Sequence, residues 1–483
     1  MEAVGKCGTA KRLKDLCTIS TFKKSDSVLL SGQVYGIYRY GMRDTFTYES
    51  IKKMLSFVTE VDYPHHVRMV AAQYLGRLKA KMDSTITNPI GQIALTERNP
   101  DIRMALAKAL GKAYNPAFVL PTIETLWRQE TDYRVKAMTD SDLDLSTRQL
   151  MMGTTLKWTR LYPRQRDSVN LSLQNAYKSA TNPYEKARLL RGLAEYGWNY
   201  PLLRDEAQNT ANPAIVRTAA TEAIASINAS PDFFRIFKGY STVVKRELKS
   251  ILFSLVYTAD AGVAAVAAES IRDPAALLNI KLMKDSVSNL YRTMQSLKLP
   301  QELETYESIR QTINYIEDTS AVAKKKSMNQ RIVDWGIITS LSDQATATIK
   351  TSKGEIKLKL LVRNAPISVA NFVSLARTGF FNNKVFHRVV PNFVIQTGCP
   401  RGDGYGSLDY TISSELTPMH YDTEGYVGMA SAGNHTECSQ WFITHSPTIH
   451  LDPNYTIFAK VIEGMDVVHK MTVGDIVEGV SIN

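Results

Sequence analysis

Residues 385–404 decide the fold of the last third of the chain: they read Val385-Phe386-His387-Arg388-Val389-Val390-Pro391-Asn392-Phe393-Val394-Ile395-Gln396-Thr397-Gly398, then Cys399, then Pro400-Arg401-Gly402-Asp403-Gly404. Successive side chains of a β-strand point to opposite faces. We therefore expect His387 and Arg388 to face opposite ways, with His387 in a structural role.

The sequence just before this stretch predicts a hairpin and a helix. Residues 347–351 and 356–360 alternate apolar and polar side chains around a turn that contains Gly354, as the two strands of a hairpin do. A helix is expected to begin at Pro366 and to end near Gly379, with an apolar stripe along one side. Strands of this kind with one such helix predict a small closed β-barrel with the helix plugging its end.

Several short motifs follow one another in a fixed order over roughly 130 residues. They are Phe386-His387-Arg388, Pro391-Asn392-Phe393, Gln396-Thr397-Gly398, Gly428-Met429-Ala430-Ser431-Ala432-Gly433, Ser439-Gln440-Trp441-Phe442-Ile443-Thr444 and Leu451-Asp452. This order resembles the cyclophilin-type peptidyl-prolyl cis/trans isomerases. The resemblance implies a closed β-barrel capped by helices, and the Pro-Arg-Gly-Asp-Gly form and short loops look more like bacterial members.

The chemistry of such an isomerase asks little of the protein. Rotation about a peptide bond costs about 18 to 20 kcal/mol, and before proline both isomers are populated. In the twisted state the prolyl nitrogen becomes basic, so a fixed donor beside it stabilises the transition state more than either planar state. Arg388 is the candidate donor, because its guanidinium stays charged at any working pH.

The resemblance implies a set of site residues. The candidate catalytic residues are Arg388, Gln396 and Phe393, with Gln396 holding the carbonyl before proline. The candidate substrate-binding residues are Val394, Ala430, Ser431, Gln440, Phe442, His450, Leu451 and Tyr455. Each of these residues taken singly could be structural, but their joint order favours a site. No cofactor and no metal is implied.

This chain departs from the family at several of these positions. His450 stands where cyclosporin-sensitive members usually have Trp, so we expect that drug to bind poorly. Tyr455 stands where His is common, Val394 where Met is commoner and Ser431 where Asn is commoner. These changes alter the wall of the pocket without removing the guanidinium or its glutamine.

The first two thirds of the chain contain a recurring pattern: a Pro, then Val or Ile followed by Arg, then an Ala-rich helix. The clearest copies start at Pro64, Pro100 and Pro213, and weaker copies lie at 132–137, 183–190 and 263–271. The first two copies are about 35 residues apart, and the pattern resembles HEAT-type repeats. An ordinary bundle of Ala-rich helices remains the alternative.

The pattern divides the chain into three parts. We expect a HEAT-like α-solenoid over 1–274, a helical spacer and polar junction over 275–330, and the cyclophilin-like domain over 331–483. Residues 3–10 are similar to the end of a repeat helix, at 109–116, which predicts a solenoid truncated at its N-terminus. A missing signal-bearing segment would place the protein in the periplasm or cell envelope; otherwise it is cytoplasmic.

Composition limits the partners. The net charge is +11, yet the part after Met328 holds about a dozen Lys and Arg against about fourteen Asp and Glu, so the excess lies in the helices. The basic residues lack a groove-reading motif, and we do not expect nucleic acid as a partner.

The four cysteines have neither zinc nor disulfide spacing. No apolar run approaches the roughly 18 residues of a membrane span.

Together these features predict an enzyme, a peptidyl-prolyl cis/trans isomerase acting on Xaa-Pro bonds of proline-containing polypeptide clients. The helical repeats would hold a protein partner, because solenoids present extended binding surfaces. The alternative is an α-solenoid scaffold whose cyclophilin domain binds Pro-containing segments with little turnover.

Overall fold

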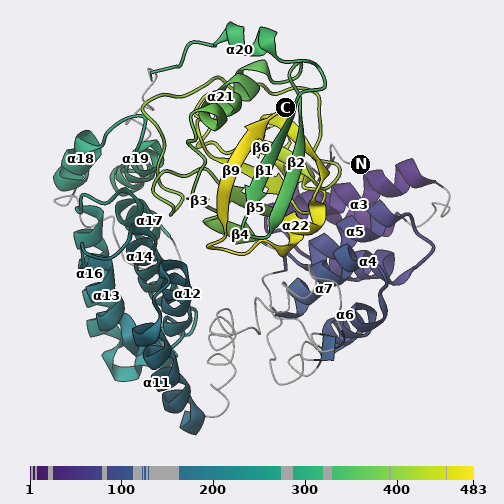
Figure 1. Cartoon of the computed structure of the whole chain (residues 1–483). Coiled ribbons are helices and arrows are strands. Elements are labelled where there is room, and N and C mark those ends of the chain that lie inside the picture. Colours follow the sequence, from purple (N-terminus) through teal and green to yellow (C-terminus); the bar gives the residue numbers. More distant parts are fainter. Residues whose placement is uncertain are drawn as a thin grey trace. The chain divides into compact units, whose positions relative to one another are not determined.

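The computed structural model describes residues 1, 4–5, 8–19, 26–78, 84–111, 122, 125–126, 129, 163–273, 287–318, 329–390, 393–452 and 454–483. The chain divides into two compact units, Met1–Asp144 and Leu145–Asn483. Figure 1 labels helices and strands of both units. None of the described helices is long and apolar enough to cross a membrane.

The first unit is helical in the part that the structure describes. Its helices are α2 (Ala10–Thr18), α3 (Ser27–Met42), α4 (Tyr48–Thr59), α5 (His65–Leu75), α6 (Ser84–Thr96) and α7 (Pro100–Gly111). Helix α4 begins with a capping box, in which Thr47 and Ser50 each accept a hydrogen bond from the other's backbone N–H. Helix α5 packs against both α4 and α7.

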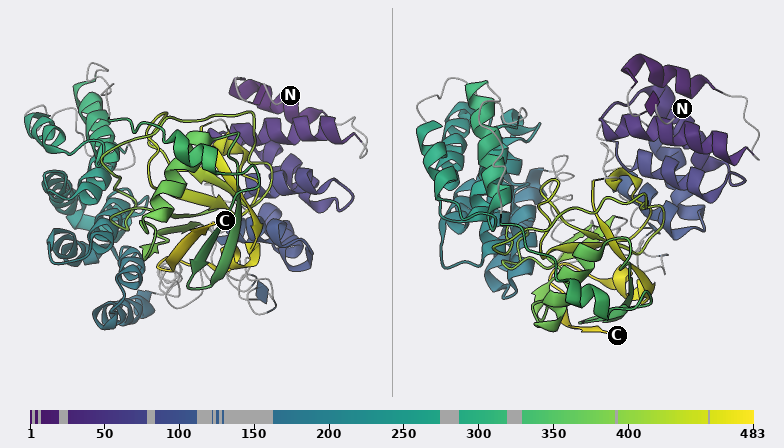
Figure 2. Two further views of the ribbon diagram at one scale, coloured as in Figure 1. Left: turned by 45° about the horizontal axis from the view of Figure 1, so that its top comes forward. Right: turned by 90° about the horizontal axis from the view of Figure 1, so that it is seen from above.

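The second unit begins with a helical region. Its helices are α11 (Pro163–Ser179), α12 (Pro183–Leu193), α13 (Tyr200–Gln208), α14 (Ala214–Asn228), α15 (Phe233–Phe237), α16 (Ser241–Val256), α17 (Ala261–Ile271), α18 (Val287–Ser296) and α19 (Leu303–Glu317), with short 3-10 turns at Gly197–Asn199 and Lys238–Tyr240. Helix α14 packs against α12, α13 and α17, and α17 packs against α16 and α19. The helices stand side by side in both views of Figure 2 and share one apolar core.

The Val-Arg pair of the predicted repeat has the same geometry in both units. Arg68 of α5 and Arg217 of α14 are both buried, and each donates to a backbone carbonyl 10 residues earlier, of Val58 and Ala207 respectively. Each also pairs with a carboxylate from the next part of the array, Glu97 or Asp260. The arginine thus satisfies carbonyls at the end of the preceding helix, where intrahelical partners are missing.

The other copies fit the pattern less closely. Arg103 of α7 donates to the nearby carbonyls of Glu97 and Arg98 instead. The copies at 183–190 and 263–271 fall on α12 and α17. The copy at 132–137, the spacer residues 275–286 and the lysines at 324–326 lie outside the described residues. A helical region is confirmed, whereas the HEAT-type solenoid and the predicted domain boundaries stay predictions.

The last third forms one curled sheet. Its strands are β1 (Thr346–Thr351), β2 (Gly354–Leu360), β3 (Lys384–Val385), β4 (Arg388–Val390), β5 (Val394–Thr397), β6 (Tyr426–Met429), β7 (Trp441–Thr444), β8 (Ile457–Glu463) and β9 (Ile476–Ile482), and its helices are α20 (Trp335–Ser340), α21 (Pro366–Arg377) and α22 (Met465–Lys470). The strands lie in the order β3-β9-β1-β2-β8-β6-β7-β5-β4. The predicted hairpin is β1 and β2, paired antiparallel.

The prediction of a closed barrel is wrong, because the sheet is a curled half-barrel. Its end strands, β3 and β4, are not paired with each other. They are successive short pieces of one extended run, separated only by Phe386 and His387. The chain itself therefore joins the two ends of the sheet, where a closed barrel would have a ladder of hydrogen bonds.

The predicted helix is α21, and it packs against β8 and β9 (Figure 1). It ends as expected: Gly379 has a φ of 72°, and the N–H groups of Gly379 and Phe380 donate to carbonyls of the last turn. The core between helix and sheet includes Phe372, Phe381 and Trp441, all almost fully buried.

Candidate active site

Three of the predicted site residues form one row across the sheet. Arg388 on β4 lies opposite Gln396 on β5, and Gln396 lies opposite Phe442 on β7. Directly opposed residues of neighbouring strands share a face and lie within contact distance. The guanidinium, the amide and the aromatic ring therefore sit side by side on one surface of the sheet.

Arg388 is the exposed member of this row. Its guanidinium carbon lies 5.4 Å from the centre of the Phe393 ring, within cation–π range. Partial desolvation by the surrounding protein lowers the pKa of Arg388, while Tyr455 acts to raise it. A guanidinium keeps its charge under such a shift, so Arg388 remains a cationic donor that water and a ligand can reach.

Gln396 is held in place by a second glutamine. Its Nε2 donates to Oε1 of Gln440 over 3.0 Å. Gln440 in turn donates through Nε2 to the carbonyls of Gly404 and Gly406, each over 2.9 Å. The orientation of Gln396 thus depends on the loop that follows Pro400, through Gln440.

An apolar cluster lies beside the row. Val394, Phe442 and Leu451 are buried together, and Phe393, Ala430 and Tyr455 pack against them. His450 stacks on Phe393 with the ring centres 5.1 Å apart, and Tyr455 meets Phe442 edge to face at 5.8 Å. These residues form a surface that suits a small apolar ring.

The backbone after β6 lies next to this cluster. Ala430 donates its N–H to the carbonyl of Gln440 over 3.0 Å, and Ala430 and Ser431 are half-buried. Ala430, Ser431 and Gln440 line one cavity. The structure thus brings all the predicted site residues into one continuous surface.

Sequence reasoning missed Tyr421. Its ring is buried, stacks on Phe442 with the centres 5.9 Å apart, and is close enough to Gly428 that a Cβ there would lie 2.2 Å from its hydroxyl oxygen. Burial raises the pKa of Tyr421 well above its ordinary value. Tyr421 precedes β6 in an irregular loop, and no local periodicity could have marked it as a wall of the site.

Among the described residues, no group of three or more His, Cys, Asp or Glu side chains is placed to hold a metal ion. The site offers an exposed guanidinium, an oriented amide and an apolar socket on one face of a curled sheet. An arrangement of this kind can hold an extended peptide with one apolar ring beside a fixed cation.

Several known proteins are similar to part of this chain. The family model of the cyclophilin type peptidyl-prolyl cis-trans isomerases matches residues 346–481. A peptidyl-prolyl cis-trans isomerase of Helicobacter pylori is 43% identical over 143 residues, which are 29% of this chain and 88% of that protein. Peptidyl-prolyl cis-trans isomerase B of Bacillus subtilis is 42% identical over 129 residues, 26% of this chain and 90% of that protein.

A solved structure is also similar to part of this chain. The crystal structure of a Cryptosporidium parvum cyclophilin type peptidyl-prolyl cis-trans isomerase is 31% identical, covers 29% of this chain and 96% of its own, and has a TM-score of 0.27. The Helicobacter pylori relative is matched over most of its length. The chain belongs to the cyclophilin-type peptidyl-prolyl cis-trans isomerases.

Proposed function

We propose that this chain is a peptidyl-prolyl cis-trans isomerase that acts on Xaa-Pro bonds of polypeptide substrates, with Arg388 as its catalytic residue. The observation that carries the assignment of residues is the row of Arg388, Gln396 and Phe442 on three neighbouring strands. The apolar cluster beside Phe442 holds the proline ring. Gln396 donates to the carbonyl that precedes the proline.

Catalysis follows from what changes when the amide twists. In the planar states the nitrogen lone pair is delocalised into the carbonyl, so it accepts no strong hydrogen bond. As the bond rotates, the lone pair returns to the nitrogen, and Arg388 donates to it from an exposed position. The chemistry requires no covalent intermediate and no cofactor, because no bond is made or broken.

The helical region serves as a platform for a protein partner or client. Support for this role comes from its side-by-side helices and from the arginine geometry that α5 and α14 share. Arrays built from repeated helix pairs present extended surfaces for protein ligands.

The test measures isomerisation and binding separately. Arg388→Ala is expected to lower kcat/KM on a chromogenic Xaa-Pro peptide by about 10²-fold, with peptide affinity, followed by NMR, little changed. Phe442→Ala should weaken binding and turnover together, because the socket is used in both states. Arg363→Ala is the matched control, since Arg363 is exposed and pairs with Asp343 outside the row.

Near-normal turnover in Arg388→Ala would remove the catalytic assignment. Binding without turnover in the unmodified chain would favour the scaffold alternative, in which the cyclophilin domain only captures Pro-containing segments.

A further inference from the structure

We propose that the helical region forms one wall of the substrate site, and that the cavity between residues 301–305 and the isomerase groove takes a basic side chain of the substrate, N-terminal to its proline. This inference rests on the proposed function and adds a substrate class to it.

The cavity lies where the helical region meets the groove. Its volume is about 40 Å³, enough for the end group of a long side chain and a water molecule. Ala430, Ser431 and Gln440 line it from the groove, and Glu302, Glu304 and Thr305 line it from the start of α19. The N–H of Ser407 donates to the carbonyl of Gln301 over 3.1 Å and joins the two walls.

The charged side chains that line the cavity in the described part of the chain are acidic. Among the described residues, Glu302 and Glu304 belong to the lining, and no Lys or Arg does. Burial, with a contribution from Asp403, raises the pKa of Glu304 to about 7, although its side chain still reaches solvent. A cation that enters the cavity would favour the charged form of Glu304, whereas an acidic side chain would disfavour it.

The surroundings of Tyr405, which also lines the cavity, are acidic as well. Burial raises the pKa of its hydroxyl, and Glu222, Glu304, Glu269 and Asp403 add to the effect. Nearby arginines are already paired. Arg401 pairs with Asp260 and Asp403, and Arg191 pairs with Glu222.

The direction of the substrate follows from the two glutamines. Gln396 is proposed to hold the carbonyl before proline, and Gln440 is hydrogen-bonded to it and also lines the cavity. Phe442 of the proline socket lies two residues beyond Gln440 in the chain. Residues that precede the proline are therefore directed toward Gln440 and the cavity.

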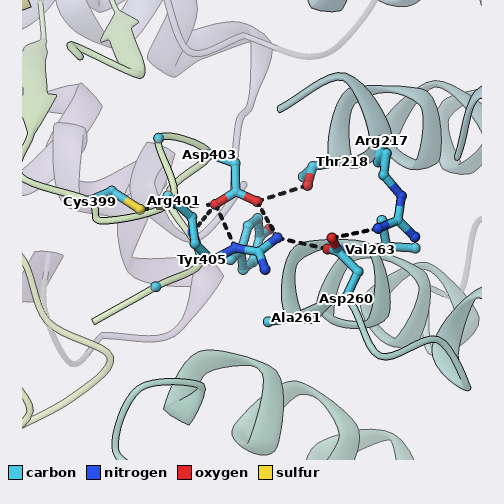
Figure 3. Close-up of polar contacts among 12 residues, drawn as sticks. Arg217, Thr218, Asp260, Ala261, Val263, Cys399, Arg401, Asp403 and Tyr405 are labelled. Atoms are coloured by element: carbon cyan, nitrogen blue, oxygen red, sulfur yellow. Dashed lines mark hydrogen bonds and ion pairs between the residues drawn. The ribbon is translucent and has the colours of Figure 1, made fainter. Parts of the chain in front are cut away.

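An ionic network fixes the wall against the isomerase loop (Figure 3). Arg401 donates to Asp260 over 2.8 Å and to Asp403 over 2.9 Å. Asp260, which caps α17, also accepts from Arg217 over 2.9 Å, and Thr218 donates to Asp403 over 3.1 Å. The carboxylates of Asp260 and Asp403 are 8% and 0% exposed, so each is paired as a buried charge must be.

Glycines allow the close approach of the two walls. A Cβ on Gly262 of α17 would lie 2.7 Å from the Asp403 carboxylate. A Cβ on Gly402 would lie 2.6 Å from the hydroxyl of Tyr184, which donates to the Gly402 carbonyl over 2.9 Å. The Asp403 and Tyr184 side chains thus occupy the space that a Cβ would need at Gly262 and Gly402.

The experiment uses the full chain and chromogenic Pro peptides that differ only in Lys, Glu or Ala at the second or third residue before the proline. The Lys peptide is expected to exceed the Glu peptide in kcat/KM by about tenfold at one of these positions. In the double variant Glu302→Gln, Glu304→Gln the Lys-to-Glu ratio should fall to about one. Glu317→Gln, on the same helix but outside the cavity, should keep the ratio.

A second pair of variants tests the wall itself. Gly262→Leu should push both Thr218 of α14 and Asp403 of the loop away from α17, and so abolish the Lys preference. Gly239→Leu is its control, because a Cβ at Gly239 meets no atom within 4 Å. Both proteins are checked for helix content by circular dichroism, and if Gly262→Leu is unfolded, the carboxylate double variant decides alone.

The outcomes separate the two proposals. Equal turnover of the Lys and Glu peptides by the unmodified chain would overturn the proposed subsite. A Lys preference that survives in the double variant would overturn it as well. In either case, turnover of the Ala peptide would leave the proposed isomerase function intact. If no peptide is turned over, the function fails. Peptide affinities then test the subsite, and equal affinity for Lys and Glu peptides overturns it.

Discussion

At the scale of single residues, the adjacent pair His387 and Arg388 has two opposite environments. Arg388 is exposed in the groove, whereas the His387 side chain is 8% exposed and lies against Gly404, where a Cβ would be 3.5 Å from the ring. Burial lowers the pKa of His387 to about 4, and Asp403 acts in the opposite direction. The alternation of side chains along a strand predicts this arrangement. It places Arg388 in the groove and His387 against the loop that contains Gly404.

A pH dependence of stability follows from His387. Its folded pKa of about 4 lies below the roughly 6.5 of an unfolded chain, so the unfolded state binds the proton more readily. The stability is complete above about pH 6.5 and declines as the pH falls toward 4, by up to about 3 kcal/mol. Denaturant unfolding between pH 7 and 4 should show this decline.

His387→Gln should flatten this decline, because the substituted side chain does not titrate. The same change at the exposed His435 is the control and should leave the decline in place. An unchanged pH profile in His387→Gln would mean that other groups govern the acid sensitivity.

The residues of the site could largely be predicted from the sequence, since Arg388, Gln396 and Phe442 lie in ordered short motifs. Tyr421 could not, because it lies in a loop without periodicity and meets Phe442 only in the fold. The pairing of Arg401 with Asp260 joins residues 141 positions apart. No local pattern reports such a contact, although the motif that contains Arg401 and Asp403 was visible.

At the scale of elements, local sequence patterns predicted single helices and hairpins correctly, but they did not predict whether the sheet closes into a barrel. The hairpin of β1 and β2 and the helix α21 follow from periodicity, Pro366 and Gly379. Whether the sheet closes depends on β3 and β4, which are two and three residues long. Segments this short carry too little periodicity to reveal which neighbours they pair with.

Asp260 connects two elements of the helical region to the isomerase, and its replacement should therefore have two effects. Asp260→Ala leaves Arg217 buried without its carboxylate and removes a partner of Arg401. We expect the free energy of unfolding of the second unit to fall by about 3 to 5 kcal/mol. We also expect a weaker preference for Lys peptides. Denaturant unfolding measures the first effect, and the ratio of kcat/KM for the Lys and Glu peptides measures the second.

Glu97→Ala is the matched control in the first unit, where Glu97 pairs with Arg68. It should destabilise that unit and leave the peptide ratio as it is. An equal change of the ratio in both variants would show that Asp260 has no particular part in docking the isomerase loop.

At the scale of the whole molecule, the helical region and the isomerase have separate apolar cores. The buried clusters run from Leu173 to Ile316 and from Ala345 to Val477 without sharing a residue. Hydrogen bonds and ion pairs cross the boundary between the two regions, such as the hydrogen bond from Ser407 to Gln301. Polar boundaries of this kind can be cut without exposing a core.

A fragment of residues 329–483 should consequently fold and isomerise Ala peptides while losing the preference for Lys peptides. The cut is placed before Arg331, whose N–H donates to the Thr411 carbonyl and whose guanidinium donates to Ser374. Circular dichroism and the peptide assay check both parts. An unfolded fragment, or one that retains the Lys preference, would contradict the expected division between the two regions.

Gly262 has a consequence for how α17 itself is encoded. Glycine within a helix is less favourable than alanine by about 1 kcal/mol, so α17 in isolation would gain from Gly262→Ala. In the intact chain the same methyl group would meet Asp403 and Thr218 at 2.7 and 2.5 Å. Local helix propensity and long-range fit therefore oppose each other at this position, and α17 carries a small frustration that its contacts with Thr218 of α14 and Asp403 of the isomerase loop explain.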